Sequence, residues 1–480
     1  MKIELQDGFI FDATYLAGAG RIEEQELESC RALFSKADEK MAMIRAAGIY
    51  EGHFSKDGIS EPVLFPGLLQ PNPDKMARLK EITTEAKGQY DSVVSFGIGG
   101  SYLGNKMLFD LFCGPYWNQM SKEERGGCPK LYFNGDNLDP EHTIGLIEQV
   151  KREAHRAKSH GKSYRLLLIV ISKSGSTVDT MATFFVMKKA LEKLGVLFDV
   201  WAITDPAEGD KATTLGKIAT QEGWIRFEIP EGIGGRFSVF CESSLVTAAL
   251  IGIDIDQLLA GASMMDRTCQ SANWRENPAL LNGALKWLGA EKYGKWIEVF
   301  MPYGTDLKSL SEWYVQLMAE SLGKKKDLAG NEVDYGRTPV VAVGTTDMHA
   351  QTQAHQEGRR DKIIQFVSVK KWRQDIKIPN LYPGSKAFTS WDGVTLGEAL
   401  EGARRSNEEA LASDGRWSAN LVLPELNEYH VGSFLYFLML SVVYEGILAN
   451  IDPFDQPGVE AYKKILGPML EEIRRGKLDL

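Results

Sequence analysis

Cysteine is scarce in this sequence and shows no pairing pattern. The 480 residues include only five cysteines, and no two of them form a C-x-x-C pair: Cys30, Cys113, Cys128, Cys241 and Cys269. An odd number of scattered cysteines fits reduced thiols better than a disulfide framework, because disulfides persist in oxidising compartments. We therefore expect a cytoplasmic protein.

The motifs of several enzyme classes are also missing. The sequence contains no H-E-x-x-H, no H-x-H and no cysteine cluster, so no metal site is predicted. It also lacks a P-loop and a G-x-S-x-G motif. Residues 97–101, GIGGS, resemble half of a dinucleotide fingerprint, but Tyr102 stands where the third glycine belongs. A nicotinamide enzyme is therefore disfavoured, and we expect no cofactor.

Long hydrophobic runs and an excess of positive charge are absent as well. The first residues show no charged region followed by an apolar run, so no signal peptide is expected. The longest apolar stretch, residues 434–448, is interrupted by Glu445, which predicts a buried helix and no membrane partner. The formal charge of −10 argues against an extended nucleic-acid surface. It does not exclude a small anionic ligand, because the binding of such a ligand depends on the basic groups at its site and not on the net charge.

The chain does carry a repeated strand and helix pattern. Its length suggests two or three domains. Two series of apolar strands alternating with helices begin near Ser92 and Lys295, which predicts an α/β fold with two doubly wound parallel sheets. The expected strands lie at residues 93–96, 166–171, 198–204, 224–229, 296–302, 340–343 and 363–369. The expected organisation is a mainly helical segment over 1–85, α/β domains over 86–245 and 246–428, and C-terminal helices over 429–480.

The most informative stretch is residues 166–177, LLLIVISKSGST. A continuous apolar run, typical of a buried parallel strand, ends in a turn rich in hydroxyl groups, which comprises Ser172, Lys173, Ser174, Gly175, Ser176 and Thr177. Ligands of parallel sheets bind beyond the carboxyl ends of the strands, and a helix N-terminus favours anions. The turn therefore predicts a phosphate site. The alternative is a polar turn without a ligand.

Two glycine-rich segments are further candidates. Gly99, Gly100 and Ser101 follow another apolar strand and can bring backbone amides to the same anion. In residues 232–238, GIGGRFS, two glycines let the backbone approach a ligand while Arg236 points into the cleft. The alternative for Arg236 is a surface turn with a solvated guanidinium group.

A predicted helix over residues 307–322 carries a candidate base. Leu310, Trp313, Tyr314 and Leu317 form its apolar stripe, and Glu320 continues that stripe. An inward carboxylate has its charged form disfavoured, which is how a general base is brought toward neutral pH. Gln316 lies one turn earlier and can face the same cavity. The alternative is a glutamate paired with an arginine.

His349 and Lys463 are the remaining candidates. His349 follows a predicted strand and the loop GTTDM, although a lone histidine is usually structural or exposed. Lys463 lies within the apolar stripe of a helix that begins near Gly458, where it can bind an oxygen or donate a proton. The alternative is a stem that runs along the apolar surface. That stripe is expected to be buried and comprises Val459, Tyr462, Leu466, Met469, Leu470 and Ile473.

Taken together, these motifs resemble the glucose-6-phosphate isomerase family, which is built from two sugar-isomerase domains. Six segments occur in the order of that family: GIGGS at 97–101, ISKSGST at 171–177, GIGGRFS at 232–238, QLMAESLGK at 316–324, GTTDMHA at 344–350 and FDQPGVEAYK at 454–463. Each is weakly specific alone, but six in order are a strong match.

The resemblance implies a role for each matching residue. Gly100, Ser101 and residues 172–177 resemble the sugar and phosphate cradle, and Gln316 and Gln456 match substrate-contacting glutamines. Glu320 matches the proton-transferring base, and Arg236 matches the arginine that stabilises the intermediate. His349 and Lys463 match the pair that opens the sugar ring, with His349 supplied by the neighbouring subunit of a homodimer.

The implied reaction interconverts glucose 6-phosphate and fructose 6-phosphate, a step of glycolysis and gluconeogenesis. It moves a proton between adjacent carbons through a cis-enediolate, which needs no metal or redox cofactor. Two alternatives remain at this stage. One is an isomerase of another sugar phosphate such as mannose 6-phosphate, and the other is a non-catalytic sugar-phosphate sensor.

Overall fold

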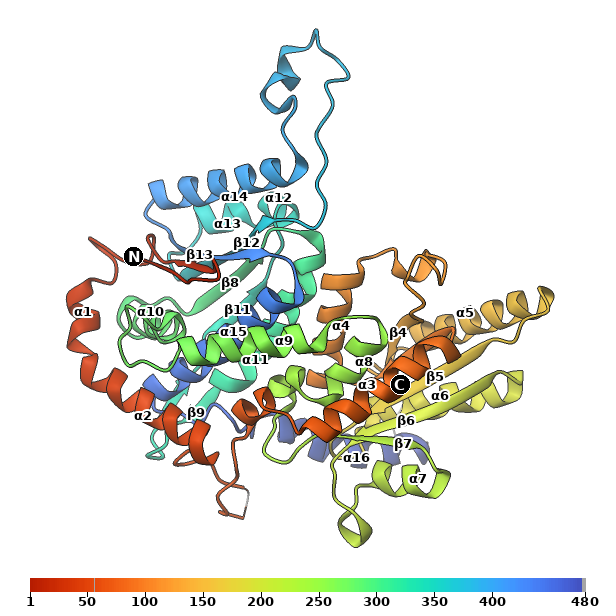
Figure 1. The fold of residues 1–480 in the computed structure, drawn as a ribbon. Coiled ribbons are helices and arrows are strands. Elements are labelled where there is room, and N and C mark those ends of the chain that lie inside the picture. Colours follow the sequence, from red (N-terminus) through yellow and green to blue (C-terminus); the bar gives the residue numbers. More distant parts are fainter. Residues whose placement is uncertain (56, 477–480) are drawn as a thin grey trace.

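Two α/β lobes, each built on a parallel sheet, lie side by side in the computed structural model (Figure 1). The structure describes residues 1–55 and 57–476. The predicted α/β class with parallel sheets is confirmed.

The first sheet has five parallel strands in the order β4-β3-β5-β6-β7. They are β3 (Ser92–Phe96), β4 (Lys130–Asn134), β5 (Arg165–Ile171), β6 (Leu197–Thr204) and β7 (Ile225–Glu228), and helices α4 (Gly100–Cys113), α5 (Pro140–Ser159), α6 (Val178–Leu194) and α7 (Thr214–Glu222) connect them. Every residue of β5 after Arg165 is buried, as its continuous apolar run predicted. The sequence missed β4, whose buried and half-buried residues are interleaved.

The second sheet has six strands in the order β1-β2-β13-β12-β8-β11. Its parallel strands are β8 (Ile297–Pro302), β11 (Thr338–Val341), β12 (Lys362–Lys371) and β13 (Trp417–Glu425), and helices α11 (Lys308–Leu322), α12 (Thr346–Ala350), α13 (Thr352–Gln356) and α14 (Leu396–Ser413) lie between them in sequence. The N-terminal hairpin of β1 (Lys2–Glu4) and β2 (Ile10–Asp12) extends this sheet by pairing antiparallel with β13. Neither β13 nor this pairing was predicted.

The remaining helices pack around and between the sheets. They are α1 (Glu24–Ser29), α2 (Arg31–Ala47), α3 (Pro73–Gln89), α8 (Glu242–Leu250), α9 (Ile255–Thr268), α10 (Pro278–Tyr293), α15 (Glu428–Leu448) and α16 (Val459–Arg474). A short hairpin of β9 (Lys324–Lys326) and β10 (Glu332–Tyr335) follows α11.

Helix α15 is the central core helix, as the sequence predicted for residues 434–448. It is long and apolar enough to cross a membrane, yet its apolar window is completely buried inside the fold. Glycines let α9 approach it closely, because a Cβ at Gly261 would lie 1.8 Å from the carbonyl oxygen of Tyr429. A Cβ at Gly432 would likewise lie 1.9 Å from the carbonyl oxygen of Leu258.

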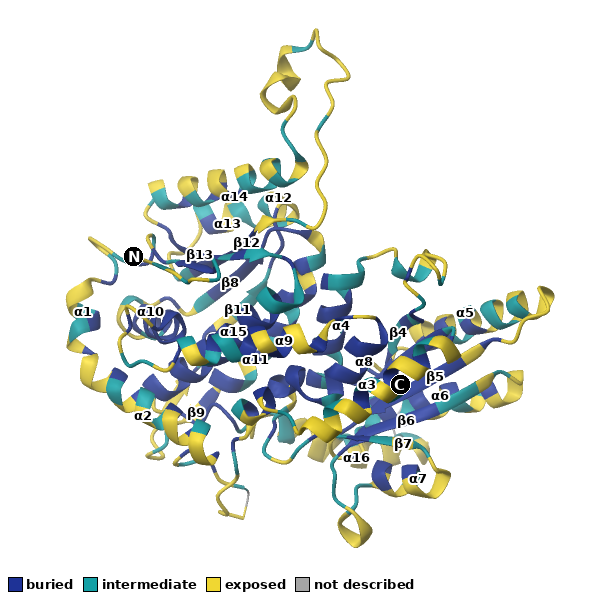
Figure 2. Cartoon of the chain, in the orientation of Figure 1, coloured by how far each residue is buried: buried dark blue, intermediate teal, exposed yellow. Residues whose placement is uncertain are grey.

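The arm between β12 and α14 and helix α16 are among the elements that expose apolar side chains. An arm over residues 374–395, between β12 and α14, projects far from the body of the molecule and is almost entirely exposed (Figures 1 and 2). Helix α16 contains no buried residue although all of it is described, so the predicted buried stripe is wrong for this chain. Val459, Leu466 and Ile473 are half-buried, whereas Tyr462, Met469 and Leu470 are exposed, because no described part of the chain covers that face.

Candidate active site

The hydroxyl-rich turn lies where the strand order of the first sheet reverses. The chain passes from β3 to β4 on one side and then to β5 on the other, so a crevice opens beyond the carboxyl ends of β3 and β5. Residues 97–101 follow β3 and residues 172–177 follow β5. The sequence placed both segments correctly at strand ends.

Hydrogen bonds within the turn fix its shape. The hydroxyl groups of Ser172 and Thr177 lie 3.0 Å apart, and the backbone N–H of Gly175 donates to Ser172 Oγ at 3.1 Å. Gly175 has a φ of +69° and lies against Thr213, so a side chain there would be both strained and obstructed. Helix α6 begins directly after Thr177, which directs its free backbone amides toward the turn.

An open cavity of about 580 Å³ lies above this turn. It brings together hydroxyls, three lysines, an amide and a carboxylate from separate parts of the chain: Ser101, Ser172, Lys173, Ser174, Thr177, Asp205, Lys211, Thr213, Gln456 and Lys463. Hydroxyl and ammonium donors at a helix N-terminus are the groups that bind a phosphate monoester. The structure thus assembles most of the predicted anion site in one cavity.

The two glycine-rich segments contact each other beside this cavity. A Cβ at Gly100 would lie 1.9 Å from the carbonyl oxygen of Gly235, so only glycine fits at position 100. This contact joins the start of α4 to the short helix at Gly235–Phe240, which carries Arg236.

Arg236 is buried and uses its whole guanidinium group, which contradicts the alternative of a solvated surface arginine. Its Nε donates to Ser321 Oγ at 2.8 Å, and Nη2 donates to the carbonyl oxygens of Pro453 and Asp455 at 2.7 and 3.1 Å. Its Nη1 donates to Glu320 at 3.3 Å and to Gln456 at 2.8 Å. Burial lowers the pKa of Arg236, an effect opposed by Glu320, and an arginine still remains charged at neutral pH.

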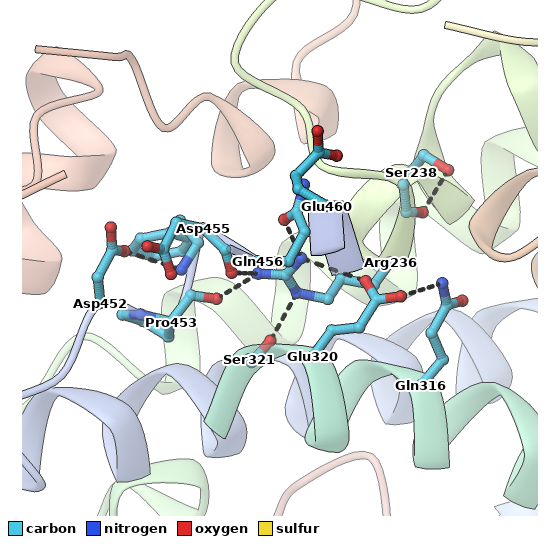
Figure 3. Close-up of polar contacts among 12 residues, drawn as sticks. Arg236, Ser238, Gln316, Glu320, Ser321, Asp452, Pro453, Asp455, Gln456 and Glu460 are labelled. Carbon is cyan, nitrogen blue, oxygen red and sulfur yellow. Dashed lines mark hydrogen bonds and ion pairs between the residues drawn. The ribbon is translucent and has the colours of Figure 1, made fainter. Parts of the chain in front are cut away.

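Glu320 and Gln316 point toward each other from α11 (Figure 3). Gln316 Nε2 donates to Glu320 Oε1 at 3.0 Å, while Oε2 faces Arg236. The predicted stripe of Leu310, Trp313, Tyr314 and Leu317 is buried, whereas the Glu320 side chain is 27% exposed. The structure therefore combines both sequence hypotheses, because the inward glutamate is paired with an arginine and remains accessible.

Gln456 links the two groups of residues. Its side chain accepts a hydrogen bond from Arg236 and also lines the cavity above the turn. The loop that carries it, residues 449–458, connects α15 to α16. Gln456 thus connects the anion cavity to the Arg236–Glu320 pair.

Lys463 and His349 differ in their placement. Lys463 lines the cavity, and its ammonium group lies 3.1 Å from Glu460 Oε1. His349 is exposed on α12 in the second lobe, and it is not among the described residues that line the cavity or contact Arg236. Within one chain, the structure does not bring His349 to the site.

Sequence reasoning missed several residues of the site. Ser321 lies within the segment QLMAESLGK and binds Arg236, and Lys211 and Thr213 line the cavity after β6. The sequence did contain a signal for Lys211 and Thr213. They follow β6, and in a parallel sheet the carboxyl end of β6 lies at the same edge as the carboxyl ends of β3 and β5. In the part of the chain that the structure describes, no group of three or more His, Cys, Asp or Glu residues could hold a metal ion.

Comparison with known proteins identifies the family. A family model described as phosphoglucose isomerase matches residues 76–478. The chain belongs to the phosphoglucose isomerase family. As a member of this family it is an isomerase, and the resemblance that the motifs indicated is confirmed.

Two relatives and one solved structure are similar to this chain over most of its length. A glucose-6-phosphate isomerase of Carboxydothermus hydrogenoformans is 36% identical over 394 residues, covering 82% of this chain and 81% of the relative. One of Pediococcus pentosaceus is 30% identical and covers 96% of this chain and 95% of the relative. Among solved structures, a hypothetical protein from Thermus thermophilus matches with a TM-score of 0.77 at 29% identity, covering 96% of this chain and 99% of that chain.

Proposed function

We propose that the protein interconverts glucose 6-phosphate and fructose 6-phosphate, as a cytoplasmic enzyme of glycolysis and gluconeogenesis. The observation that carries this proposal is the double role of Gln456. It lines a cavity suited to a phosphate group and accepts a hydrogen bond from Arg236, the arginine that is paired with the Glu320 carboxylate. A sensor would need the cavity alone, whereas this site also holds an accessible carboxylate against a buried arginine.

The cavity above the turn is proposed to hold the phosphate. Ser101, Ser172, Ser174, Ser176 and Thr177 supply hydroxyls or backbone amides, Gly100 and Gly175 allow close approach, and Lys173, Gln456 and Lys463 complete the cradle. Binding energy from the unreactive phosphate holds the reacting carbons at a fixed place relative to Glu320.

Glu320 is proposed to take the proton from C2 of the open sugar and return it to C1. Gln316 donates to one carboxylate oxygen and Arg236 faces the other, which fixes the orientation of the carboxylate, and its exposed part is proposed to face the substrate. The enediolate formed between these steps carries negative charge on oxygen. Arg236 is a preorganised positive partner for that charge, since its five N–H groups are fixed by surrounding acceptors.

Ring opening requires an acid and a base near the ring oxygen and the hydroxyl at C1. Lys463 lines the cavity and is proposed as one partner. His349 is proposed as the other, contributed by the neighbouring subunit of a homodimer. The exposed position of His349 on α12 supports this arrangement, because it is free to enter the site of a second chain.

The exposed apolar elements support a homodimer. Leu381, Tyr382 and Trp391 of the arm are 73%, 67% and 46% exposed, and α16 exposes Tyr462 and Ile465. Large apolar side chains grouped on projecting elements mark protein interaction surfaces. A second copy of the chain is the proposed partner at these surfaces, which an isologous twofold interface would cover in both subunits.

The test of the reaction is a coupled assay that follows glucose 6-phosphate formed from fructose 6-phosphate, with other sugar phosphates such as mannose 6-phosphate tested in parallel. Glu320→Gln is expected to lower kcat by about 10²–10⁴-fold, the range for loss of general base catalysis, while still binding substrate. Glu312→Gln, a partly exposed glutamate earlier on α11, is the matched control. Near-normal turnover of Glu320→Gln contradicts the assignment of the base.

A mixed dimer tests the shared site. Glu320→Gln and His349→Asn chains carrying different tags are co-expressed, and the dimer that holds one of each is purified. If His349 acts across the interface, one of the two sites is intact and the mixed dimer has about half the wild-type activity. If His349 acts within its own chain, both sites are defective and the mixed dimer is inactive.

A further inference from the structure

Lys324 is a buried lysine beside the proposed active site. The reaction described above assigns no role to this residue. It lies two residues after the end of α11 at Leu322, and its side chain is only 4% exposed. Burying an ammonium group is costly unless it is hydrogen-bonded or paired with a charge. The acceptors that surround Lys324 therefore indicate what it does.

Two carbonyl oxygens from separate elements accept hydrogen bonds from Lys324. Its Nζ donates to the carbonyl oxygen of Glu320 at 2.6 Å and to that of Asp455 at 3.0 Å. The first bond caps the last turn of α11, where free carbonyls attract a positive charge. The second reaches the residue directly before Gln456. One ammonium group thus ties the turn that carries Glu320 to the loop that carries Gln456.

Arg236 shares one of these acceptors. Its Nη2 donates to the same carbonyl oxygen of Asp455 at 3.1 Å. The loop is held from its other side by His53, whose Nδ1 lies 2.8 Å from Asp452 Oδ2. Without Lys324, the loop would remain attached through Arg236 and His53 but would lose its direct bond to the end of α11.

The charges around Lys324 come from three elements. Arg236 faces it from the short helix at Gly235–Phe240, Asp455 and Asp452 face it from the loop, and Glu320 lies on α11. The Asp455 carboxylate lies 3.4 Å from the ammonium group. Burial, followed by the positive charge of Arg236, lowers the pKa of Lys324 to about 8, even though Asp455 and Asp452 oppose the shift. The group therefore changes charge within an accessible pH range.

We propose that Lys324 is a positioning residue for the isomerisation, which sets the Glu320 carboxylate and the Gln456 amide relative to each other through their backbones. This inference rests on the proposed role of Glu320 as the base. Without the two hydrogen bonds from Lys324, the Glu320 and Gln456 side chains are still present, but the end of α11 and the loop can move apart. A displacement of about 1 Å at a reacting group can reduce the rate by about 10²-fold.

The first test compares Lys324→Met with Lys325→Met. Lys325 is the next residue and is exposed, and its ion pair with Glu332 lies at the surface. Lys324→Met is expected to lower kcat about 10–100-fold and to raise KM by a smaller factor, because the phosphate hydroxyls stay in place. Lys325→Met should match the wild type. Equal kcat values for the two variants overturn the proposal.

The second test uses pH and does not depend on the methionine variant being folded. In the wild type, kcat should fall as pH rises through about 8, because Lys324 loses its charge and its hold on the carbonyls weakens. Lys324→Arg keeps the charge to higher pH, so the fall in kcat should move upward. An unchanged profile in Lys324→Arg contradicts the proposal.

Thermal stability separates this role from a structural one. The folded chain binds the proton of Lys324 less tightly than the unfolded chain, in which a lysine pKa is about 10.4. Between these two pKa values the unfolded state binds more protons, so this group makes stability rise with pH while kcat falls. Joint decline of stability and kcat would assign Lys324 a structural role. Failure of the base assignment is separate, since it appears as near-normal turnover in Glu320→Gln.

Discussion

Four parallel strands have the same order in both sheets, but the residues that follow these strands differ. In the first sheet β3 lies between β4 and β5, and in the second β8 lies between β11 and β12. Each sheet therefore has a position for a ligand-binding crevice beyond the carboxyl ends of two neighbouring strands. These strands are β3 and β5 in the first sheet and β8 and β12 in the second. The first position is an open cavity lined by hydroxyls.

The second position holds a tryptophan, which also lines a neighbouring cavity of about 660 Å³. Trp372 directly follows β12, and a Cβ at Gly304, directly beyond β8, would lie 2.7 Å from its ring. Strand β12 ends at Lys371 and is followed by Trp372 and Arg373, with none of the hydroxyls that follow β5. Lys371 is also paired with Glu425 at 2.7 Å. Topology thus provides two equivalent positions, and the side chains decide which one can bind an anion.

The amino ends of the two sheets are similar, in contrast to the carboxyl ends. In the first sheet Glu153 accepts hydrogen bonds from Tyr132 at 3.0 Å and Tyr164 at 2.9 Å, and it also pairs with Lys130. In the second, Glu298 pairs with Lys286 at 2.5 Å and with Arg337. Both amino ends therefore hold a carboxylate satisfied by several donors, which indicates a structural role.

The largest effect is expected at the amino end of the second sheet. Glu298→Gln removes a charge that is completely buried and leaves Lys286 and Arg337 incompletely paired. Breaking a buried pair costs about 3–5 kcal/mol, so the free energy of unfolding should fall by that amount in urea denaturation. Glu332→Gln, at an exposed pair, is the control. Equal stability of the two variants contradicts a structural role for this end.

The next effect is expected at the carboxyl end of the first sheet. Ser174→Ala combined with Thr177→Ala removes two hydroxyls from the cavity, each worth about 1.5 kcal/mol toward a charged group. KM for fructose 6-phosphate should rise about 100-fold with a smaller change in kcat. Thr305→Ala, an exposed hydroxyl beyond β8 in the second sheet, should leave KM unchanged. If both variants raise KM equally, the distinction between the two crevices is wrong.

The sequence predicted the first crevice because its signals are local. A buried strand followed by SKSGST needs no distant residue to be recognised, and the stripe of α11 follows from helical periodicity alone. The Arg236–Glu320 pair and the carbonyls that hold Arg236 were not predictable, since residues 84 and 217 positions apart meet only in the fold. The burial of α16 was predicted wrongly for a related reason. Its periodicity shows that one face is apolar but does not show what covers that face.

The smallest effect is expected at the crevice position of the second sheet, where Trp372 lies beside Gly304. Gly304 has a φ of +142°, and Gly304→Ala would place a Cβ against Trp372. Backbone strain at such a position costs about 1–3 kcal/mol, and the contact with the ring adds to it. Gly330→Ala is the matched control, because Gly330 has a φ of +88° but no atom within 4 Å of its Cβ position.

Thermal unfolding of the two variants separates strain from crowding. If Trp372 fills the crevice tightly, Gly304→Ala should be less stable than Gly330→Ala by about 1 kcal/mol or more. The coupled assay should give an unchanged KM for both, because the second crevice is not proposed to hold substrate. A raised KM in Gly304→Ala alone would mean that the second sheet contributes to sugar-phosphate binding, and the contrast between the two sheets would then be one of degree.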